Sequence, residues 1–365
     1  MMQKKMKKIL IVSIVPYSHT NRGIDTITSY FIEKGWKVSH LVFGVNSLKR
    51  SMKTEKIKID KFQQLFSKLS YFSYLGIMGK YFPDFLLKYI IRKTNETAKY
   101  IDFNEFNLII LETGKPLFLL NIIPKNIPLV IRVSDPIEYS FGNRRKLFEK
   151  LEKEAIERAS LTLIAHEKLR KFYKKEFTNT ILWKTGFDET RIIKQDVKNN
   201  DSIVYMGNTG VDYELLKYLA IKNKEIKFYI IGNHKKKKLE KNIIFLGYLD
   251  STKYVELINK SKCFFMPFND YEVERLKMLG MTSKFYTALT LGKAILTRKY
   301  GSIQKDNKDL NIFTYDNFEE ADFKLKFILS NNFTKTKKID EFLESLKNKN
   351  RKLELNKILI QKKII

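Results

Sequence analysis

The sequence contains a single cysteine, Cys263, among 365 residues. This excludes a disulfide framework and a metal site built on cysteine, and it fits a reducing compartment such as the cytoplasm. Histidine is also scarce, with four residues and no spacing typical of a metal site. No uncharged stretch approaches the roughly 18 to 20 apolar residues that a membrane-spanning helix needs. We therefore expect a soluble or peripheral protein.

The first residues combine a basic segment with a short apolar run, as a signal peptide does. The run stops at Pro16, and no small-x-small cleavage pattern follows it. We therefore expect residues 9–15 to form the first buried strand. No G-x-G-x-x-G pattern comes after this strand, which argues against a nicotinamide or flavin dinucleotide site.

Positive charge is in large excess, because 69 Lys and Arg face 40 Asp and Glu, a formal net charge of +29. This predicts an anionic partner such as nucleic acid, an acidic membrane surface or a phosphorylated substrate, although a lysine-rich proteome gives the same composition. The aromatic residues form no RNP-like or OB-like pattern, and there is no basic helix or zinc finger. A basic, non-enzymatic nucleic-acid-binding protein is therefore the alternative and not the main hypothesis.

The length of the chain suits two domains of about 150 to 200 residues each. Two series of apolar strands alternate with amphipathic helices, which predicts parallel sheets with ligand-binding loops at the strand carboxyl ends. The expected fold is α/β, with two Rossmann-like doubly wound domains facing a cleft. We expect an N-terminal domain over residues 1–190, a linker over 191–201, a C-terminal domain over 202–335 and a helical tail over 336–365.

Residues 58–93 interrupt this alternation. Apolar residues from Phe62 to Phe72 are spaced as on a helix, and a second helical pattern runs from Phe82 to Ile90, with basic residues around both. Aromatic and basic side chains on one amphipathic segment suit the interface of an anionic membrane, which predicts a membrane-docking insertion. The other interpretation is a pair of helices packed on the sheet with their lysines in water.

The stretch from Cys263 to Arg298 predicts a strand, a loop, a helix and a second strand. Its helix begins at Thr282-Ser283-Lys284, so free N–H groups, a hydroxyl and an ammonium lie at the positive end of the helix dipole, where a diphosphate binds. An ordinary N-capped helix with a solvated lysine has the same pattern. Glycines at 207, 210, 232 and 247 come at or just after strand ends, where the backbone can approach a ligand, although turns need glycine too.

Two carboxylates end neighbouring strands of the first domain, Glu112 in LIILET and Asp135 in VIRVSD. Both are expected at the ligand-binding edge of the sheet, where one could take a proton from an attacking hydroxyl. For Asp135 a structural role is the alternative, since Ser134-Asp135-Pro136 is also a good helix start with Asp as N-cap.

With these residues the chain resembles the GT-B glycosyltransferases, in which the second domain binds a nucleotide-sugar and the first binds the acceptor. Within that superfamily it is most similar to the membrane-associated glucuronosyltransferase of xanthan assembly. The likeness covers most of the chain in order but is weak residue by residue. The matching segments are SHTNRGIDTIT, LETG, VIRVSD, TGFD, MGNTGVD, LGYLD and TSKFYTALTLGKAI.

The resemblance implies that Asp135 is the general base of an inverting transfer. It also implies that Ser283 and Lys284 contact the donor diphosphate. Thr209, Tyr248 and Leu249 would lie around the nucleoside, and Thr287 would contact the donor from the helix that begins at Thr282. The expected donor-binding residues are Gly207, Asn208, Thr209, Tyr248, Leu249, Ser283, Lys284 and Thr287. The expected acceptor-binding residues are His19, Arg22 and Glu112.

Departures from the family pattern limit what is carried over. Tyr248 and Thr287 replace different residue types, so glucuronate as the sugar is not implied. Retaining GT-B relatives usually place two glutamates seven residues apart at this helix, and the absence of a glutamate in MTSK favours inversion.

A lysine and a helix N-terminus can stabilise the leaving diphosphate without a bound metal, so we expect neither metal nor cofactor. The expected donor is a UDP-sugar. The expected partners are a lipid-linked saccharide acceptor and an anionic membrane surface, with no nucleic acid. The protein would then act in polysaccharide biosynthesis, peripherally attached to the cytoplasmic face of the cell membrane.

Overall fold

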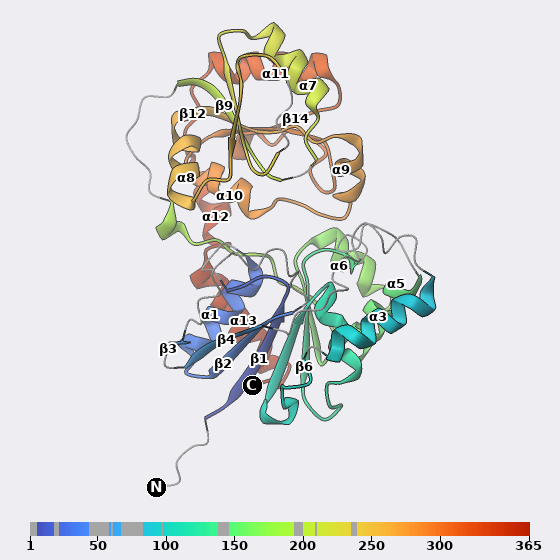
Figure 1. Cartoon of the computed structure of the whole chain (residues 1–365). Helices are drawn as coiled ribbons and strands as arrows, with labels where there is room; N and C mark the ends of the chain where they lie inside the picture. The colour runs from blue at the N-terminus through green and yellow to red at the C-terminus, as the bar shows by residue number, and fades with distance from the viewer. Residues whose placement is uncertain are drawn as a thin grey trace. The chain divides into compact units, whose positions relative to one another are not determined.

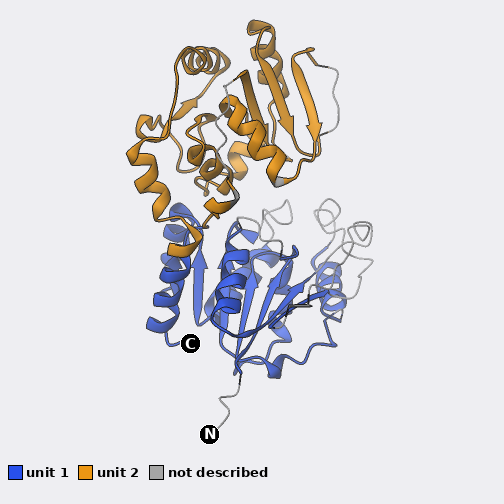
Figure 2. Ribbon diagram, turned by 90° about the vertical axis from the view of Figure 1, so that its left-hand side faces the viewer, with its two compact units in different colours: residues 1–185, 351–365 blue, residues 186–350 orange. Residues whose placement is uncertain are grey.

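The computed structural model describes residues 6–17, 22–43, 58–59, 61–66, 83–96, 98–137, 146–192, 200–208, 210–234 and 239–365. The chain divides into two compact units (Figure 2). The first unit comprises residues 1–185 and 351–365, and the second comprises residues 186–350. The C-terminal end of the chain therefore returns to the unit in which the chain begins.

The first unit is built on an eight-stranded sheet with the order β3-β4-β2-β1-β5-β6-β7-β8 (Figure 1). All neighbouring strands are parallel except β3 and β4. The strands are β1 (Lys8–Ser13), β2 (Lys37–Val42), β3 (Lys58–Ile59), β4 (Phe62–Phe66), β5 (Leu108–Glu112), β6 (Leu129–Val133), β7 (Leu161–Ile164) and β8 (Thr180–Leu182).

Continuous apolar strands are expected where helices cover both faces of a sheet, and β1, β5, β6 and β7 are almost wholly buried. The covering helices include α1 and α13, which share one hydrophobic core with β1 and with both tryptophans, Trp36 and Trp183. The helices of this unit are α1 (Gly23–Glu33), α3 (Asp84–Glu96), η2 (Phe103–Glu105), η3 (Lys115–Asn121), α5 (Lys146–Arg158), α6 (Glu167–Lys174) and α13 (Asn348–Gln361).

The second unit has a six-stranded parallel sheet with the order β11-β10-β9-β12-β13-β14. The strands are β9 (Asn200–Met206), β10 (Lys227–Ile231), β11 (Ile243–Gly247), β12 (Ser261–Met266), β13 (Ala294–Arg298) and β14 (Ile312–Tyr315). The helices are η4 (Glu189–Arg191), α7 (Tyr213–Lys222), α8 (Ser251–Lys260), α9 (Asp270–Arg275), α10 (Ser283–Thr290), η5 (Lys308–Leu310), α11 (Phe318–Ser330) and α12 (Lys337–Glu344).

Side-chain caps fix the starts of several helices in the second unit. An Asp, Asn or Thr oxygen accepts a backbone N–H of the first turn, which satisfies a donor that the helix itself leaves free. These capping residues are Asp212 for α7, Asp250 for α8, Asn269 for α9, Asn317 for α11 and Thr336 for α12.

The structure confirms the expected fold class of two Rossmann-like α/β units with parallel sheets. The sequence places the domain boundary at residue 190, whereas the second unit begins at 186. Most of the expected linker, residues 193–199, lies outside the described residues. The expected tail forms α12 in the second unit and α13, of which residues 351–361 belong to the first unit.

The prediction of a helix from Phe62 was wrong over residues 62–66, which form strand β4 parallel to β2. Apolar residues at 62, 65 and 66 fit either pattern over so short a segment, and pairing with β2 decides between them. Phe62 is buried, with its ring centroid 5.1 Å from that of Tyr17. Residues 67–82 lie outside the described part of the chain.

The second predicted helix of that segment is confirmed as α3, but its apolar residues do not form one stripe. Leu87 and Ile90 are buried against the unit, whereas Phe85 and Tyr89 are exposed. Within the described residues, no helix is both long and apolar enough to cross a membrane.

Candidate functional site

The second unit has a topological switch point between β9 and β12, which are neighbours in the sheet. The chain leaves β9 toward β10 on one side and leaves β12 toward β13 on the other. In open α/β sheets ligands bind at the carboxyl ends of the strands at such a point. The two diverging loops are tied together there, since Asp212 N donates to Pro267 O at 2.7 Å and Asn269 N donates to Gly210 O at 2.8 Å.

The loops after β9, β10 and β11 also approach one another closely at this edge. Gly232, with φ +134°, has no room for a side chain because a Cβ would lie 1.8 Å from the carbonyl oxygen of Gly207. Gly232 N donates to Gly247 O at 2.8 Å, and Asn233 N donates to the side-chain oxygen of Asn208 at 3.1 Å. The predicted residues Gly207 and Asn208 are therefore held in place by the next two loops of the sheet.

His234 is a member of this edge that the sequence analysis did not single out. Its Nε2 lies 2.7 Å from the carbonyl oxygen of Gly207, and its Nδ1 lies 3.1 Å from the hydroxyl of Tyr213. The imidazole thus connects the β9 loop with the first residue of α7. The sequence signal that could have indicated His234 as a site residue was its position two residues after Gly232, just past the end of a buried strand.

Helix α10 begins differently from the capped helices of this unit. Its N-cap residue, Thr282, makes no side-chain hydrogen bond to the helix, and its hydroxyl oxygen is buried without a hydrogen-bond partner in the described structure. There is no acidic residue in the first turn. The positive end of the helix dipole is therefore left without a counter-charge from its own helix.

Lys284 in the first turn of α10 supplies a cation beside the β9 loop. Its Nζ lies 3.4 Å from the point that a Cβ on Gly207 would occupy. Within the described residues the ammonium has no hydrogen bond or ion pair, and burial lowers the pKa of this lysine. The structure thus brings together three residues that the sequence analysis placed at the donor site, Gly207, Ser283 and Lys284.

A buried carboxylate, Glu272, lies close beneath this loop in α9. It forms an ion pair with Arg275, with 3.0 Å between Arg275 Nε and Glu272 Oε2, and a Cβ on Gly210 would lie 2.4 Å from Glu272 Cγ. Its charge raises the pKa of Lys284 and so opposes the effect of burial. Glu272 therefore favours the charged form of Lys284.

Tyr205, near the end of β9, also lies against this loop. A Cβ on Gly207 would come within 2.2 Å of the Tyr205 hydroxyl oxygen. Burial raises the pKa of this tyrosine, and Glu272 raises it further. The phenol thus stays neutral and fills the space beneath Gly207.

The remaining expected donor residues are arranged in different ways. Tyr248 follows β11 with 82% of its surface exposed, so its ring is available to stack on a planar group, and Leu249 beside it is partly buried. Thr287 is buried, and its hydroxyl donates to Ser283 O of its own helix at 3.4 Å. Thr209 lies outside the described residues.

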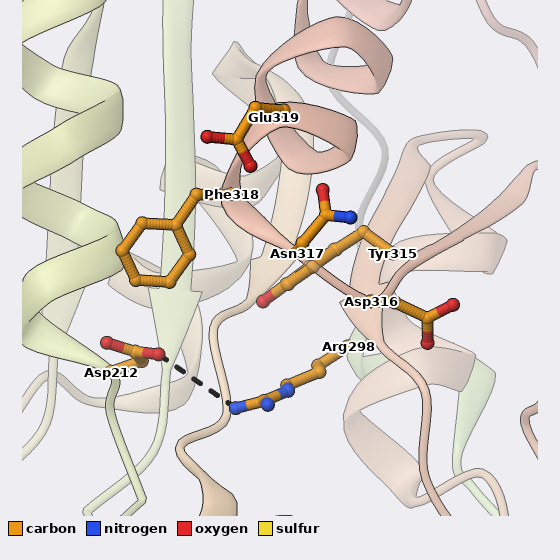
Figure 3. Close-up of a pocket in the computed structure, with 7 residues that line it drawn as sticks. All are labelled: Asp212, Arg298, Tyr315, Asp316, Asn317, Phe318 and Glu319. Atoms are coloured by element: carbon orange, nitrogen blue, oxygen red, sulfur yellow. Dashed lines mark ion pairs between the residues drawn. The ribbon is translucent and has the colours of Figure 1, made fainter.

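A pocket of about 330 Å³ lies at the carboxyl ends of β13 and β14, near the first residues of α7 and α11 (Figure 3). Among its described lining residues the only cation is Arg298, whose guanidinium lies 4.0 Å from Asp212 and 2.5 Å from Asp270. Because this cation is already paired, the pocket suits an anionic diphosphate less than the start of α10. The lining residues are Asp212, Arg298, Tyr315, Asp316, Asn317, Phe318 and Glu319.

The first unit has its own switch point, between β1 and β5. There the hydroxyl of Ser13 donates to Glu112 Oε2 at 2.6 Å. Burial raises the pKa of Glu112, and the Ser13 hydrogen bond and the charges of Arg22 and Arg132 oppose this. Arg22 also forms an ion pair with Asp25 at 2.9 Å. The third expected acceptor residue, His19, lies outside the described residues.

Arg132 is a fully buried arginine of β6 and pairs in register with Glu112 of β5. Its side chain donates to the hydroxyl of Thr185 at 3.0 Å and lies over the ring of Trp183 at 5.1 Å. Burial lowers its pKa to about 10, while the carboxylates of Glu112 and Asp135 raise it. The signal for it in the sequence is an arginine inside the apolar run VIRV, which was not among the expected site residues.

Asp135 comes two residues after β6, and residues 138–145 lie outside the described structure. Both expected carboxylates of the first unit, Glu112 and Asp135, thus lie within electrostatic reach of the same buried guanidinium. Among the described residues there is no group of three or more His, Cys, Asp or Glu that could hold a metal ion.

No family model and no curated protein matches the chain. Solved structures are similar along its whole length. Sucrose-phosphate synthase from Thermosynechococcus elongatus has a TM-score of 0.72 at 11% identity, covering 97% of this chain and 98% of that one. Anabaena HepE in complex with UDP and glucose has a TM-score of 0.70 at 14% identity, covering 97% and 100%.

A third structure, α,α-trehalose 6-phosphate synthase from Burkholderia multivorans, has a TM-score of 0.65 at 7% identity and covers 98% of this chain and 97% of that one. Identities this low establish the fold alone. Together with the two parallel sheets, they show that the chain has the two-domain GT-B fold.

Proposed function

We propose that the protein is a nucleotide-sugar-dependent glycosyltransferase that uses a UDP-sugar as donor. The observation that carries the proposal is the start of α10, where Lys284 has no ion pair in the described structure and lies beside Gly207 at the β9/β12 switch point. A helix N-terminus without a side-chain cap and a lysine together suit a diphosphate. HepE, which has the same fold, was solved with UDP and glucose.

The chemistry of the donor site follows from its charges. When the bond from the sugar to the diphosphate breaks, negative charge develops on the leaving oxygen. Lys284 and the first N–H groups of α10 stabilise that charge, while Glu272 helps to keep the lysine protonated before the donor binds. Tyr248, with its exposed ring, and Leu249 are proposed to contact the nucleoside, with Asn208, Thr209 and Thr287 completing the site.

In the first unit, Asp135 is proposed to be the general base that removes the proton of the acceptor hydroxyl in an inverting transfer. Arg132 lies within electrostatic reach of Asp135 and of Glu112. The Ser13–Glu112 pair at the β1/β5 switch point is proposed to bind a second acceptor hydroxyl, with Arg22 and His19 nearby in the sequence of the β1–α1 loop.

The acceptor is proposed to be a lipid-linked saccharide of polysaccharide biosynthesis, reached by the protein at the cytoplasmic face of the membrane. Support comes from the net charge of +29 and from α3, which exposes Phe85, Lys88, Tyr89 and Arg92 at helical spacing. Aromatic and basic side chains on one helix face suit an anionic interface. The xanthan-type glucuronosyltransferases remain the proposed nearest family.

The test is the binding of UDP, GDP, ADP and CMP to the purified protein, followed by their sugar conjugates, measured by thermal shift and titration calorimetry. We expect one diphosphate to bind selectively and Lys284→Ala to weaken it by about 10- to 150-fold, the equivalent of a charge-assisted hydrogen bond. The matched control is Lys253→Ala, which removes an exposed lysine of α8. No binding by well-folded protein would refute the proposal and favour a nucleic-acid binder.

A further inference from the structure

A groove of about 860 Å³ lies on the first unit between α3 and α5. Its size falls within the range of small-molecule sites. The apolar part of its lining is aliphatic and comes from three elements, because Ile91 lies on α3, Ile122 follows η3, and Leu147 and Leu151 lie on α5. Its described lining therefore offers a surface for a hydrocarbon chain and includes no aromatic platform for a base.

The charged part of the lining is mainly basic. Glu96 is held by Lys93 at 3.1 Å, and Glu154 lies 3.8 Å from Lys150. Four cations of the lining have no ion pair with another described residue and are exposed. They are Lys88, Arg92, Lys99 and Lys146. These ammonium and guanidinium groups are available to an anionic ligand.

The solvent-facing side of α3 also carries apolar and basic side chains, next to the groove. Phe85 is 74% exposed and Tyr89 is 43% exposed, and with Lys88 and Arg92 they follow the i, i+3, i+4, i+7 spacing of one helix face. Aromatic rings and long basic side chains are the residues that settle at the headgroup level of a membrane. Exposed aromatics of this size on a helix next to an apolar groove indicate an interaction surface.

An anionic head and an aliphatic tail on one ligand fit both parts of the groove. On α3 the lining runs from Asp84 to Glu96, which at the rise of an α-helix is about 18 Å. That length accommodates a phosphate group and part of a hydrocarbon chain. Inside the groove a nucleic acid would meet the cations, but the described lining between them is aliphatic and gives its bases no side chain to stack on.

We infer that the groove between α3 and α5 binds a single acidic phospholipid of the membrane, with its phosphate at the basic rim and an acyl chain on the aliphatic floor. This rests on the membrane association proposed above but not on the transfer reaction. It differs from docking by diffuse charge, because a groove of this kind holds one lipid with a defined stoichiometry. Lipid occupancy would orient the first unit on the membrane surface.

The experiment is native mass spectrometry and calorimetry of the full chain with short-chain dihexanoylphosphatidylglycerol, with dihexanoylphosphatidylcholine as the neutral counterpart. We expect one phosphatidylglycerol per chain and about 30-fold weaker binding for Lys88→Glu/Arg92→Glu, since each of the two cations near an anionic lipid contributes about 1 kcal/mol. Ile122→Trp, which fills the groove without changing charge, should weaken binding to a similar extent.

The matched control is Lys357→Glu/Lys362→Glu, which makes the same charge change at exposed lysines in and just after α13. Equal losses in the control and in the groove variant would overturn the inference in favour of diffuse charge. Equal binding of phosphatidylcholine, or of glycerol phosphate in place of the lipid, would overturn it as well. UDP titration of the same samples separates the two proposals, because the lipid result stands whether or not the nucleotide binds.

Discussion

The hydroxyl of Ser13 at the end of β1 donates a 2.6 Å hydrogen bond to Oε2 of Glu112 at the end of β5. The bond joins the two strands at the topological switch point of the first unit, where the chain continues from β1 to one side of the sheet and from β5 to the other. It supplies one partner to a carboxyl group whose pKa burial raises. A carboxyl group in such an environment destabilises the fold when it is ionised. Its position at a switch point, where ligands bind in open α/β sheets, makes Glu112 a candidate functional residue.

We expect Glu112→Gln to stabilise the protein at neutral pH, because the amide keeps an acceptor for Ser13 and removes a buried charge. A carboxyl with a raised pKa contributes stability that is present below its ordinary pKa, near 4.3, and is lost as pH rises through its folded value. The Tm difference between variant and wild type should therefore be close to zero near pH 4 and positive at pH 7.

Thermal melts across this pH range measure the difference, and Glu105→Gln is the control. Glu105 pairs with Lys8 at 2.8 Å, and its side chain is 55% exposed. Its substitution should leave Tm almost unchanged across the range, as is usual for an exposed ion pair. A Glu112→Gln protein that melts below wild type at pH 7 would contradict the prediction.

A second prediction compares Gly232→Ala with Gly247→Ala, two glycines at positive φ at strand ends of the second unit. At Gly232 the new Cβ would lie 1.8 Å from the carbonyl oxygen of Gly207, whereas at Gly247 nothing lies within 4 Å. Gly232→Ala should therefore displace the Gly207 loop and weaken nucleotide binding about tenfold or more. Gly247→Ala should cost about 1 to 2 kcal/mol of backbone strain and leave binding intact.

Calorimetry with UDP and thermal melts of the two variants check this comparison. If both lose binding to the same degree, the close approach of Gly232 to Gly207 is not what shapes the site. If both bind as wild type, the β9 loop is not part of the nucleotide site. Only a loss of UDP binding confined to Gly232→Ala would support a nucleotide site shaped by the close approach of Gly232 to Gly207.

Local signals in the sequence predicted much of this fold. Apolar runs such as LIILE predicted buried parallel strands, and their alternation with amphipathic segments predicted two α/β units. The helix prediction for residues 62–66 failed because a five-residue run with apolar residues at 62, 65 and 66 has too few positions to separate the helical period from the alternation of a strand. Pairing with β2, which is distant in sequence, decided its structure.

The site was only partly predictable for a related reason. Ser283, Lys284 and Gly207 each have a local signature, a helix start or a glycine after a strand. Glu272 has none, and Arg132 shows in the sequence only as a charge inside the apolar run VIRV. The roles of both depend on burial against residues distant in sequence, such as Gly210 and Trp183. Residues that tune the charge of others are visible only when the tertiary contacts are known.

A third prediction concerns α13, which returns to the first unit. Trp183 Nε1 donates to Arg351 O at 3.1 Å, and Leu359 is fully buried in the core that contains both tryptophans. Leu359→Ala should destabilise the unit by about 2 to 5 kcal/mol because it leaves a cavity. The neighbouring Ile360, 55% exposed, is the matched control, and its substitution by alanine should stay within about 0.5 kcal/mol.

Urea unfolding followed by tryptophan fluorescence measures this difference. The signal reports the first unit, because Trp36 and Trp183 are the two tryptophans of the chain and both belong to that unit. Equal, small effects of the two substitutions would show that α13 does not contribute to the stability of the unit. A loss confined to Leu359→Ala would show that it does.

The last prediction separates catalysis from donor binding through Asp135→Asn. The amide has almost the same shape and can still start a helix as an N-cap, so the fold should be retained. It cannot accept the proton of the acceptor hydroxyl, and the transfer rate should fall by about 10²- to 10⁴-fold, the usual contribution of a general base. The affinity for UDP should stay as in wild type, because the proposed donor residues belong to the second unit.

Single-turnover transfer and UDP titration on the same preparation provide the two readouts, with Glu112→Gln measured alongside. A large loss of rate in Asp135→Asn with unchanged UDP affinity supports Asp135 as the base. If Asp135→Asn transfers at the wild-type rate while Glu112→Gln does not, the base is Glu112. Asp135 would then have the structural role that the sequence Ser134-Asp135-Pro136 also fits, that of a helix N-cap.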